Sequence, residues 1–266
     1  TVGEALAQAP VDAISITGST RAGKRVAEIA SQNLHKFILE LGGSDPFVVL
    51  KDADVDKAAE IGVASRFLNN GQSCIAAKRF IVQEEVLEEF TKKFQEHVEK
   101  QIVGDPLDPK TTIGPLVRGN SREVIAKQIS ESTSVGAKIL TGGDAPNGTG
   151  FFFNPTVLTH VQPEMSVSRE EVFGPVAPII SVKNPIQAIK IANDTEFGLG
   201  SSIWSEKYAI ENNLAKDIDA GMVYINSMVI SDPRVPFGGV KNSGIGRELS
   251  DYGIKEFVNV KSVIIN

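Results

Sequence analysis

The sequence predicts an α/β protein with a largely parallel sheet, and three observations support that prediction. Short apolar runs rich in β-branched residues alternate along the chain with longer segments whose apolar residues recur at helical spacing. The chain has 266 residues, of which 41% are hydrophobic, so it can bury a large core. It carries no internal repeat, heptad pattern or low-complexity tract. We therefore expect one large domain or two smaller ones.

Residues 1–41 contain the pattern strand, turn, helix, strand. The three elements are expected over residues 11–17, 23–34 and 37–41. Gly18, Ser19 and Thr20 form the turn, whose backbone N–H groups and helix dipole can bind a phosphate. The spacing from Gly18 to Gly23 does not match G-x-G-x-x-G, and a bare turn before a helix is more often structural. One βαβ unit is too little for a doubly wound cofactor domain, so we expect it to be the last piece of one.

Residues 42–250 continue the alternation of strands and helices. Strands are expected over residues 47–50, 78–83, 138–140, 176–182, 200–204 and 222–226. Helices are expected over residues 52–67, 86–101, 121–135, 186–193 and 206–218. An extended segment over residues 151–161 contains Pro155, which favours a break or a sheet edge there. Strands separated by helices in this way indicate a sheet whose strands are mostly parallel.

Two features stand out near the C-terminus. Four glycines between residues 236 and 248 predict a loop shaped by its backbone and packed near a site. Residues 258–265 are apolar and predict a strand with an unpaired edge, which invites pairing with another subunit. We therefore expect a homo-oligomer, either a dimer or a tetramer.

Composition excludes several classes of partner. The net charge is −6 and the basic residues are scattered, so nucleic acid and anionic membranes are not expected partners. No apolar run approaches the roughly 18 residues that a membrane-spanning helix needs, and we expect a soluble chain. Three scattered histidines and one cysteine give no metal-ligand spacing, so no metal site is expected. A single cysteine fits a reducing compartment, which favours the cytoplasm.

Glu40 and Cys74 are the two residues whose local setting suggests chemistry. Glu40 lies in an apolar run before two glycines, where desolvation raises a carboxyl pKa toward that of a useful general base. Cys74 follows a small, polar segment at a turn or helix start, where backbone N–H groups can lower a thiol pKa and stabilise an oxyanion. A lone cysteine is more often a small buried hydrophobe, and a lone glutamate in an apolar run is more often ion-paired. These two positions alone favour a structural role.

Six short segments favour a catalytic role for Glu40 and Cys74 instead. They are Thr17-Gly18-Ser19-Thr20, Leu39-Glu40-Leu41-Gly42-Gly43, Gly71-Gln72-Ser73-Cys74, Glu170-Glu171-Val172-Phe173-Gly174-Pro175, Asn193-Asp194 with Phe197-Gly198-Leu199, and Pro236-Phe237-Gly238-Gly239 with Gly244-Ile245-Gly246-Arg247-Glu248. Together, in this order and at these spacings, they resemble the aldehyde dehydrogenase superfamily. The residues that follow Glu40 and Cys74 look most like its succinate-semialdehyde dehydrogenase branch.

The resemblance implies a mechanism. Cys74, as a thiolate, would attack the aldehyde carbonyl to give a thiohemiacetal, and its N–H would help to stabilise the oxyanion. Hydride would then pass to the nicotinamide of NAD or NADP, leaving a thioester. Glu40 would activate the water that hydrolyses this thioester to the acid.

The resemblance also implies which residues bind the cofactor and the small-molecule aldehyde. Cofactor contacts are implied for Gly18 and Ser19 at the pyrophosphate, Gly23 allowing its close approach, the Leu41 carbonyl at the carboxamide, Glu171 at the ribose and Phe173 at the nicotinamide. Substrate contacts are implied for Leu68, Ser73, Arg234 and Phe237. Outside the motif, Glu171 would be half of a solvated acidic pair and Phe173 a core aromatic residue.

Two departures from the family pattern are visible. The semialdehyde branch places an arginine six positions before the cysteine to hold the substrate carboxylate, and Leu68 stands there instead. Arg66 would face elsewhere on a helix, and Arg234 is a candidate replacement, although a surface arginine is the commoner role. The family's oxyanion asparagine, its cofactor-binding lysine and most of its nucleotide-binding sheet would lie N-terminal to these residues.

This chain is therefore expected to be the C-terminal half of such an enzyme and inactive alone. Its expected divisions are residues 1–41 as the end of the NAD(P)-binding domain, 42–250 as the catalytic thiol domain and 251–266 as an oligomerisation strand. Three alternatives stay open: another short-chain aldehyde as substrate, a non-catalytic dimerising fragment, and a cysteine-dependent esterase or acyltransferase, which would need a histidine beside Cys74. The sequence does not distinguish NAD from NADP.

Overall fold

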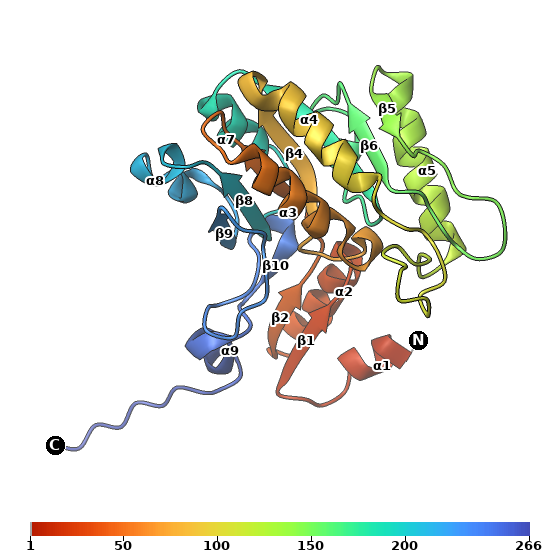
Figure 1. Cartoon of the computed structure of the whole chain (residues 1–266). Coiled ribbons are helices and arrows are strands. Elements are labelled where there is room, and N and C mark those ends of the chain that lie inside the picture. Colours follow the sequence, from red (N-terminus) through yellow and green to blue (C-terminus); the bar gives the residue numbers. More distant parts are fainter. Residues whose placement is uncertain (1) are drawn as a thin grey trace.

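Two sheets organise residues 2–266, the part of the chain described by the computed structural model (Figure 1). The larger sheet has seven strands in the order β5-β6-β7-β4-β3-β8-β9. Its strands are β3 (Asp45–Val49), β4 (Ala77–Gln83), β5 (Lys138–Thr141), β6 (Thr156–Thr159), β7 (Val176–Val182), β8 (Gly200–Trp204) and β9 (Met222–Ile225). All neighbouring pairs are parallel except β5 and β6. The predicted α/β class with a largely parallel sheet is confirmed.

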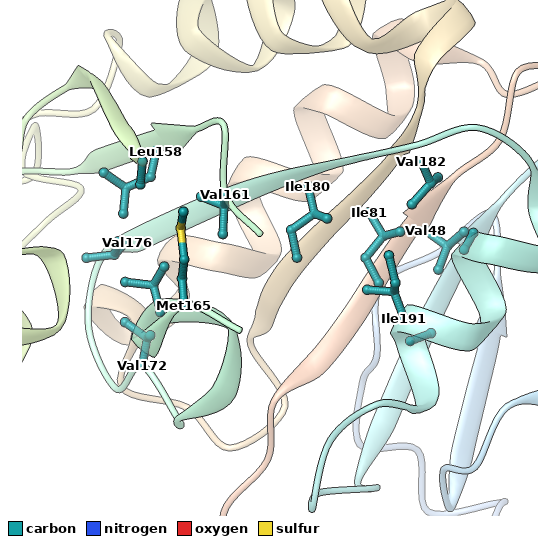
Figure 2. Close-up of a cluster of buried hydrophobic side chains, with 14 of the residues drawn as sticks. Val48, Ile81, Leu158, Val161, Met165, Val172, Val176, Ile180, Val182 and Ile191 are labelled. Carbon is teal, nitrogen blue, oxygen red and sulfur yellow. The ribbon is translucent and has the colours of Figure 1, made fainter. Parts of the chain in front are cut away.

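Helices cover both faces of the larger sheet. The helices α3 (Val55–Phe67) and α4 (Glu84–Val98) lie side by side over one face (Figure 1). The helices α5 (Gly119–Ser134), α6 (Ser166–Arg169) and α7 (Pro185–Asn193) contribute to the core on the other face, part of which Figure 2 shows. In β3, Phe47 and Val49 face the first layer, and Val48 faces the second. Because both faces are covered, every residue of β3 and β4 is buried, and the middle of each strand, residues 47–49 and 80–82, is continuously apolar.

The smaller sheet has three strands in the order β1-β2-β10. The strands β1 (Ala13–Thr17) and β2 (Lys36–Glu40) are parallel, and helix α2 (Thr20–Gln32) connects them, so the predicted βαβ unit is present. The third strand, β10 (Gly244–Ile245), comes from the glycine-rich loop and pairs antiparallel with β2. A Cβ on Gly244 would lie 1.9 Å from the carbonyl oxygen of Leu39, so only glycine allows this pairing. The loop therefore fastens the small sheet to the rest of the chain.

Two predicted elements near the C-terminus are wrong. The helix expected over residues 206–218 is instead α8 (Tyr208–Glu211) followed by the 3-10 helix η2 (Leu214–Asp217). Asn213 interrupts it with a φ of +50°, in the left-handed region that asparagine tolerates better than most residues. The strand expected over residues 258–265 is not formed, because an edge strand needs a partner for its backbone.

Short elements escaped the sequence patterns. The helix α9 (Ser250–Glu256) occupies the start of residues 251–266, the segment expected to be an oligomerisation strand. The helix α1 (Val2–Ala7) precedes β1. The 3-10 helices η1 (Leu68–Gly71) and η3 (Lys241–Ser243) also appear. Periodicity needs about two turns to be visible, and these segments are shorter. Within residues 2–266, the helices are all too short or too polar to cross a bilayer.

Candidate active site

A cavity of about 650 Å³ lies where the small sheet meets the larger domain, and Cys74 is part of its wall. Its lining comes from the turn between β1 and α2, the end of β2, the segment before β4, the start of α5 and the loop after α6. These residues are Thr17, Gly18, Ser19, Leu41, Gly42, Gln72, Ser73, Cys74, Arg118, Asn120, Ser121, Val124, Ile125, Glu171 and Phe173. Segments far apart in the sequence thus share one concave surface, the usual setting of a ligand site.

The turn that carries Cys74 is held by a buried arginine. Arg66, in the last turn of α3, is fully buried and donates from Nη2 to the carbonyl of Gly71 at 2.8 Å and from Nη1 to that of Ala77 at 2.9 Å. Nη2 also donates to the carbonyl of Gly174 at 2.8 Å. A Cβ on Gly71, whose φ is +74°, would lie 2.2 Å from that same carbonyl oxygen. The turn that carries Cys74 and the loop after α6 are therefore held together.

A second set of hydrogen bonds joins the turn to the segment before α5. Asn70 donates from Nδ2 to the carbonyl of Pro115 at 3.2 Å and accepts from the Gly114 N–H at 2.8 Å. The Gln72 Oε1 accepts from the Val117 N–H at 2.9 Å. These contacts bring residues 118–121 to the rim of the cavity. The left-handed conformation of Asn70, with a φ of +58°, aims its side chain at this segment.

The environment of the Cys74 thiol differs from the expectation. Cys74 lies in a turn and is partly buried, and burial raises its pKa above the ordinary value of a thiol. The Lys78 ammonium and a hydrogen bond from the Ile75 N–H act in the opposite direction, while the carboxylates of Asp45 and Glu171 add to the rise. The expected net lowering by backbone N–H groups is therefore wrong, because desolvation is the largest effect.

Lys78 was not singled out by sequence reasoning, although it lies directly behind Cys74. Its side chain is fully buried, and Nζ donates to the carbonyls of Ser73 and Cys74 at 2.9 and 2.8 Å. Nζ also lies 3.7 Å from Oε1 of Glu171. Burial lowers the pKa of Lys78, and the carboxylates of Asp45 and Glu171 raise it. The sequence did offer one signal for this residue, because Lys78 follows Cys74 by four residues and begins the strand expected over residues 78–83.

Glu40 ends β2 and is buried, with 3% of the residue exposed. Burial raises its pKa to about 8, Glu248 adds to the rise and Arg247 opposes it. Neither carboxyl oxygen has a hydrogen-bond partner among the described residues. A Cβ on Gly238 would lie 2.7 Å from Oε1, so the glycine-rich loop packs directly against it. Glu40 is not among the residues that line the cavity, and Leu41 and Gly42 separate it from that surface along the chain.

Glu171 reaches the end of β2 from the loop after α6. Its Oε1 accepts a hydrogen bond from the Gly43 N–H at 3.0 Å. A Cβ on Gly42 would lie 2.4 Å from its Oε2, so this approach requires glycine. The neighbouring Glu170 instead accepts a hydrogen bond from the Gln128 side chain at 2.9 Å and does not line the cavity. Phe173 is 42% exposed and lines the cavity, so it is not a core residue.

The N-terminus of α2 opens onto the same cavity and fits a phosphate group. Ser19 is the N-cap of this 13-residue helix, and its Oγ accepts a hydrogen bond from the Ala22 N–H at 3.3 Å. Gly18 and Ser19 are both exposed there. Gly23 does not line the cavity, but a Cβ on it would lie 2.4 Å from the Leu41 side chain. Helix N-termini bind anions through free N–H groups and the helix dipole, so a cofactor phosphate suits this position.

The four residues expected to contact substrate fall into two groups. Ser73 lines the cavity, and Phe237 packs against the small apolar cluster that also contacts Cys74. Leu68 is 45% exposed and does not line the cavity. Arg234 lies in a separate depression beside Pro236 and Tyr252, where its Nε donates to Asp232 at 2.9 Å. The structure therefore brings Ser73 and Phe237 to Cys74, but not Leu68 or Arg234.

Arg118 also escaped sequence reasoning. It precedes α5, is exposed and is the cationic residue among those described as lining the cavity. Asn120 and Ser121, in the first turn of α5, accompany it. In the sequence these residues lie just before or at the start of the helix expected over residues 121–135. The hydrogen bonds of Asn70 and Gln72 to residues 115 and 117 bring them near Cys74.

Comparisons with known proteins agree with this arrangement. The model of the Aldehyde dehydrogenase family matches residues 1–263. An NADP(+) succinate-semialdehyde dehydrogenase 1 of Mycobacterium ulcerans is 47% identical over 253 residues, which is 95% of this chain and 55% of the relative. The protein of the same name from Mycobacterium tuberculosis is 47% identical over 263 residues, which is 98% of this chain and 58% of the relative.

Among solved structures, an NADP-dependent enzyme of E. coli superposes with a TM-score of 0.95 and 41% sequence identity, over 98% of this chain and 54% of the other. The chain thus spans a little more than half the length of the proteins it matches.

Proposed function

The chain belongs to the aldehyde dehydrogenase family, and on that premise we propose that it carries the nucleophile and part of the cofactor site of an NADP-dependent succinate-semialdehyde dehydrogenase. The observation that carries the proposal is the shared cavity, where Cys74 faces the N-terminus of α2 and Glu171. Nucleophile, phosphate site and ribose-binding carboxylate are the parts that such an oxidation needs in one place. The names of the two mycobacterial relatives support NADP and succinate semialdehyde.

In the proposed mechanism, Cys74 acts as the nucleophile. Its thiolate attacks the aldehyde carbon, and the former carbonyl oxygen becomes an oxyanion that the Cys74 N–H stabilises. A bound NADP supplies the acceptor for the hydride that leaves this carbon. Loss of hydride leaves a thioester on Cys74, which water hydrolyses to the carboxylic acid and the free thiol. Gly18, Ser19 and Glu171 would hold the cofactor, and Phe173 would pack against it.

Glu40 is proposed to act as the general base for the hydrolytic step. A carboxylate with a pKa of about 8 accepts a proton from water more readily than an ordinary glutamate does. Its two unpartnered oxygens leave it free to accept that proton. Because Glu40 does not line the cavity, the base reaches the thioester by a side-chain movement or through a water molecule.

The proposal includes the organisation of the whole protein. Residues 1–41 would end a cofactor domain, residues 42–250 would form the thiol domain and residues 251–266 would join subunits of a cytoplasmic homo-oligomer. The edge of β1 supports the first division, because within the described part of the chain β2 is the only strand that pairs with it. The exposed apolar side chains of Val260 and Ile264 support the last.

The test compares this chain with the full-length protein that contains it. We expect the full-length protein to reduce NADP with succinate semialdehyde, and this chain alone to show no such activity. Iodoacetamide labelling of Cys74 should abolish the activity, and NADP should slow the labelling. If aldehyde oxidation is absent while cofactor-free ester hydrolysis persists, the proposal fails in favour of an esterase. If neither activity appears and Cys74 is inert, the proposal fails in favour of an assembly role.

A further inference from the structure

We propose that Lys78 is a positioning residue that holds and electrostatically activates the Cys74 nucleophile and, through the same ammonium group, fixes Glu171. The inference rests on the proposed function, because it concerns how that site works. Lys78 lies on β4, one side-chain length behind the nucleophile turn, and does not line the cavity. It therefore acts on the reaction only through other residues.

The peptide bond between Cys74 and Ile75 links Lys78 to the thiol. The Lys78 Nζ donates to the carbonyl oxygen of that peptide at 2.8 Å. The N–H of the same peptide, on Ile75, hydrogen-bonds to the Cys74 thiol. A charged donor on the carbonyl polarises the amide and makes its N–H a stronger donor, since hydrogen bonds in a chain reinforce one another. The positive charge of Lys78 is thus transmitted to the sulfur through one peptide.

Lys78 is also connected to Glu171 through Gly43, just after the end of β2. A Cβ on Gly43 would lie 2.7 Å from the Cys74 carbonyl oxygen, so the strand end presses against the oxygen that Lys78 holds. The Gly43 N–H in turn donates to Oε1 of Glu171, which lies 3.7 Å from Nζ. Lys78 therefore touches both the nucleophile turn and the carboxylate proposed to bind the ribose. One ammonium group connects the two halves of the site.

The free-energy cost of burying Lys78 also points to an electrostatic role. Burying a lysine completely is unfavourable unless the charge is compensated. Among residues 2–266, Lys78 has only carbonyl oxygens as hydrogen-bond partners, with the Glu171 carboxylate at a longer distance and Asp45 nearby. Arg66 already donates hydrogen bonds to the carbonyls of Gly71 and Ala77 on either side of Cys74 in sequence, so a second buried cation is not needed to hold the backbone alone. The buried positive charge of Lys78 is explained if it stabilises the thiolate form of Cys74.

The charged groups around this pair act in both directions. Asp45 on β3 and Glu171 on the loop after α6 raise the pKa of the thiol, and Lys78 on β4 lowers it. Arg66 on α3 is a like charge that disfavours the protonated form of Lys78. Removing Lys78 leaves only the Ile75 N–H, among these groups, to oppose the two carboxylates. The thiol should then ionise only at a higher pH.

The experiment measures the rate of Cys74 alkylation by iodoacetamide as a function of pH in the full-length protein, without aldehyde or cofactor. We expect Lys78→Met to raise the apparent pKa of labelling by about one unit or more, and to slow labelling at pH 7 by about tenfold. Lys78→Gln removes the charge but keeps donors, and should shift the profile in the same direction. Lys93→Met is the matched control, because Lys93 pairs with Asp56 between α3 and α4, and its profile should not shift.

Two outcomes would overturn the proposal. A folded Lys78→Met variant whose labelling profile coincides with that of the wild type would show that the charge does not reach the sulfur. A variant with a lowered Tm but an unchanged profile would assign Lys78 a purely structural role. If Lys78→Met does not fold, Lys78→Gln carries the same test. Since labelling uses no substrate, a wild-type protein that fails to oxidise succinate semialdehyde refutes the proposed function separately.

Discussion

The backbone N–H of Gly43 donates a hydrogen bond to Oε1 of Glu171 at 3.0 Å, which joins the end of β2 to a loop 128 residues away. This bond uses Oε1 and leaves Oε2 beside Gly42, and both Gly42 and Glu171 line the cavity. Glu171→Gln should therefore raise the KM for NADP by about tenfold, because a hydrogen bond to a charged group contributes about 1.5–3 kcal/mol. The measurement is steady-state kinetics of the full-length enzyme. Glu170→Gln, a neighbour outside the cavity, is the control, and equal effects of both would contradict the assignment.

Glu40 should control the release of the acid product. In Glu40→Gln the thioester should form but hydrolyse slowly, so a burst of NADPH should be followed by a steady rate about 10²-fold lower. In the wild type the hydrolytic rate should rise with pH and level off above about pH 8, because the base must be deprotonated. Stopped-flow absorbance at several pH values checks both. A mutant without a burst would place Glu40 in an earlier step.

The same carboxyl group should make stability depend on pH. Its folded pKa of about 8 exceeds the ordinary value of 4.5, so the folded state binds the proton more tightly. That contribution is complete below pH 4.5 and is lost as the pH rises through about 8. Glu40→Gln should therefore gain about 2–4 kcal/mol of unfolding free energy relative to the wild type between pH 5 and pH 9. Urea denaturation measures it, and the exposed Glu28→Gln should show no such trend.

Gly23 should matter through its contact with Leu41. A Cβ there would meet the Leu41 side chain at 2.4 Å and push it toward the cavity that Leu41 lines. Gly23→Ala should raise the Kd for NADP several-fold, equivalent to about 1 kcal/mol of overpacking. Fluorescence titration of the full-length protein measures this. Gly3→Ala, in a helix with open space around the added methyl group, should leave binding unchanged.

Arg118 should contribute to binding of the anionic cofactor. It is a cationic group at the cavity rim, and it is exposed, so its contribution should be modest and sensitive to salt. Arg118→Ala should raise the KM for NADP by about threefold at low ionic strength and less at 0.5 M salt. Arg122→Ala, one helical turn away and outside the cavity, is the control. A salt-independent effect would indicate a packing role instead.

Much of the fold could be predicted because long elements show periodicity. Helix α4, which was expected over residues 86–101, buries Val86, Phe90, Phe94 and Val98, which recur every four residues along one face. The two-residue strand β10 could not be predicted, because its pairing depends on the close approach of Gly244 to β2 rather than on any local pattern. The expected helix over residues 206–218 failed for a different reason, because the left-handed conformation of Asn213 interrupts a segment that looks helical in sequence.

The site was predictable where short motifs carry it and not where tertiary contacts do. Cys74, Glu171, Phe173, Gly18 and Ser19 were expected together, and the structure places them on one cavity. Lys78 and Arg118 were missed, because burial behind a turn and anchoring by distant side chains leave no mark on sequence spacing. The direction of the Cys74 pKa shift was also wrong, because the loss of solvent around the thiol outweighs the local N–H group.

Arg66 has one further consequence. Its guanidinium donates to carbonyl oxygens on both sides of Cys74 and to those of Val172 and Gly174 after Glu171. Neither segment can open without breaking bonds that also hold the other, so the two should exchange their amide hydrogens as one cooperative unit. An ageing or partly heated preparation would then lose its reactive thiol and its affinity for the nucleotide in the same event, with no intermediate that retains only one of them.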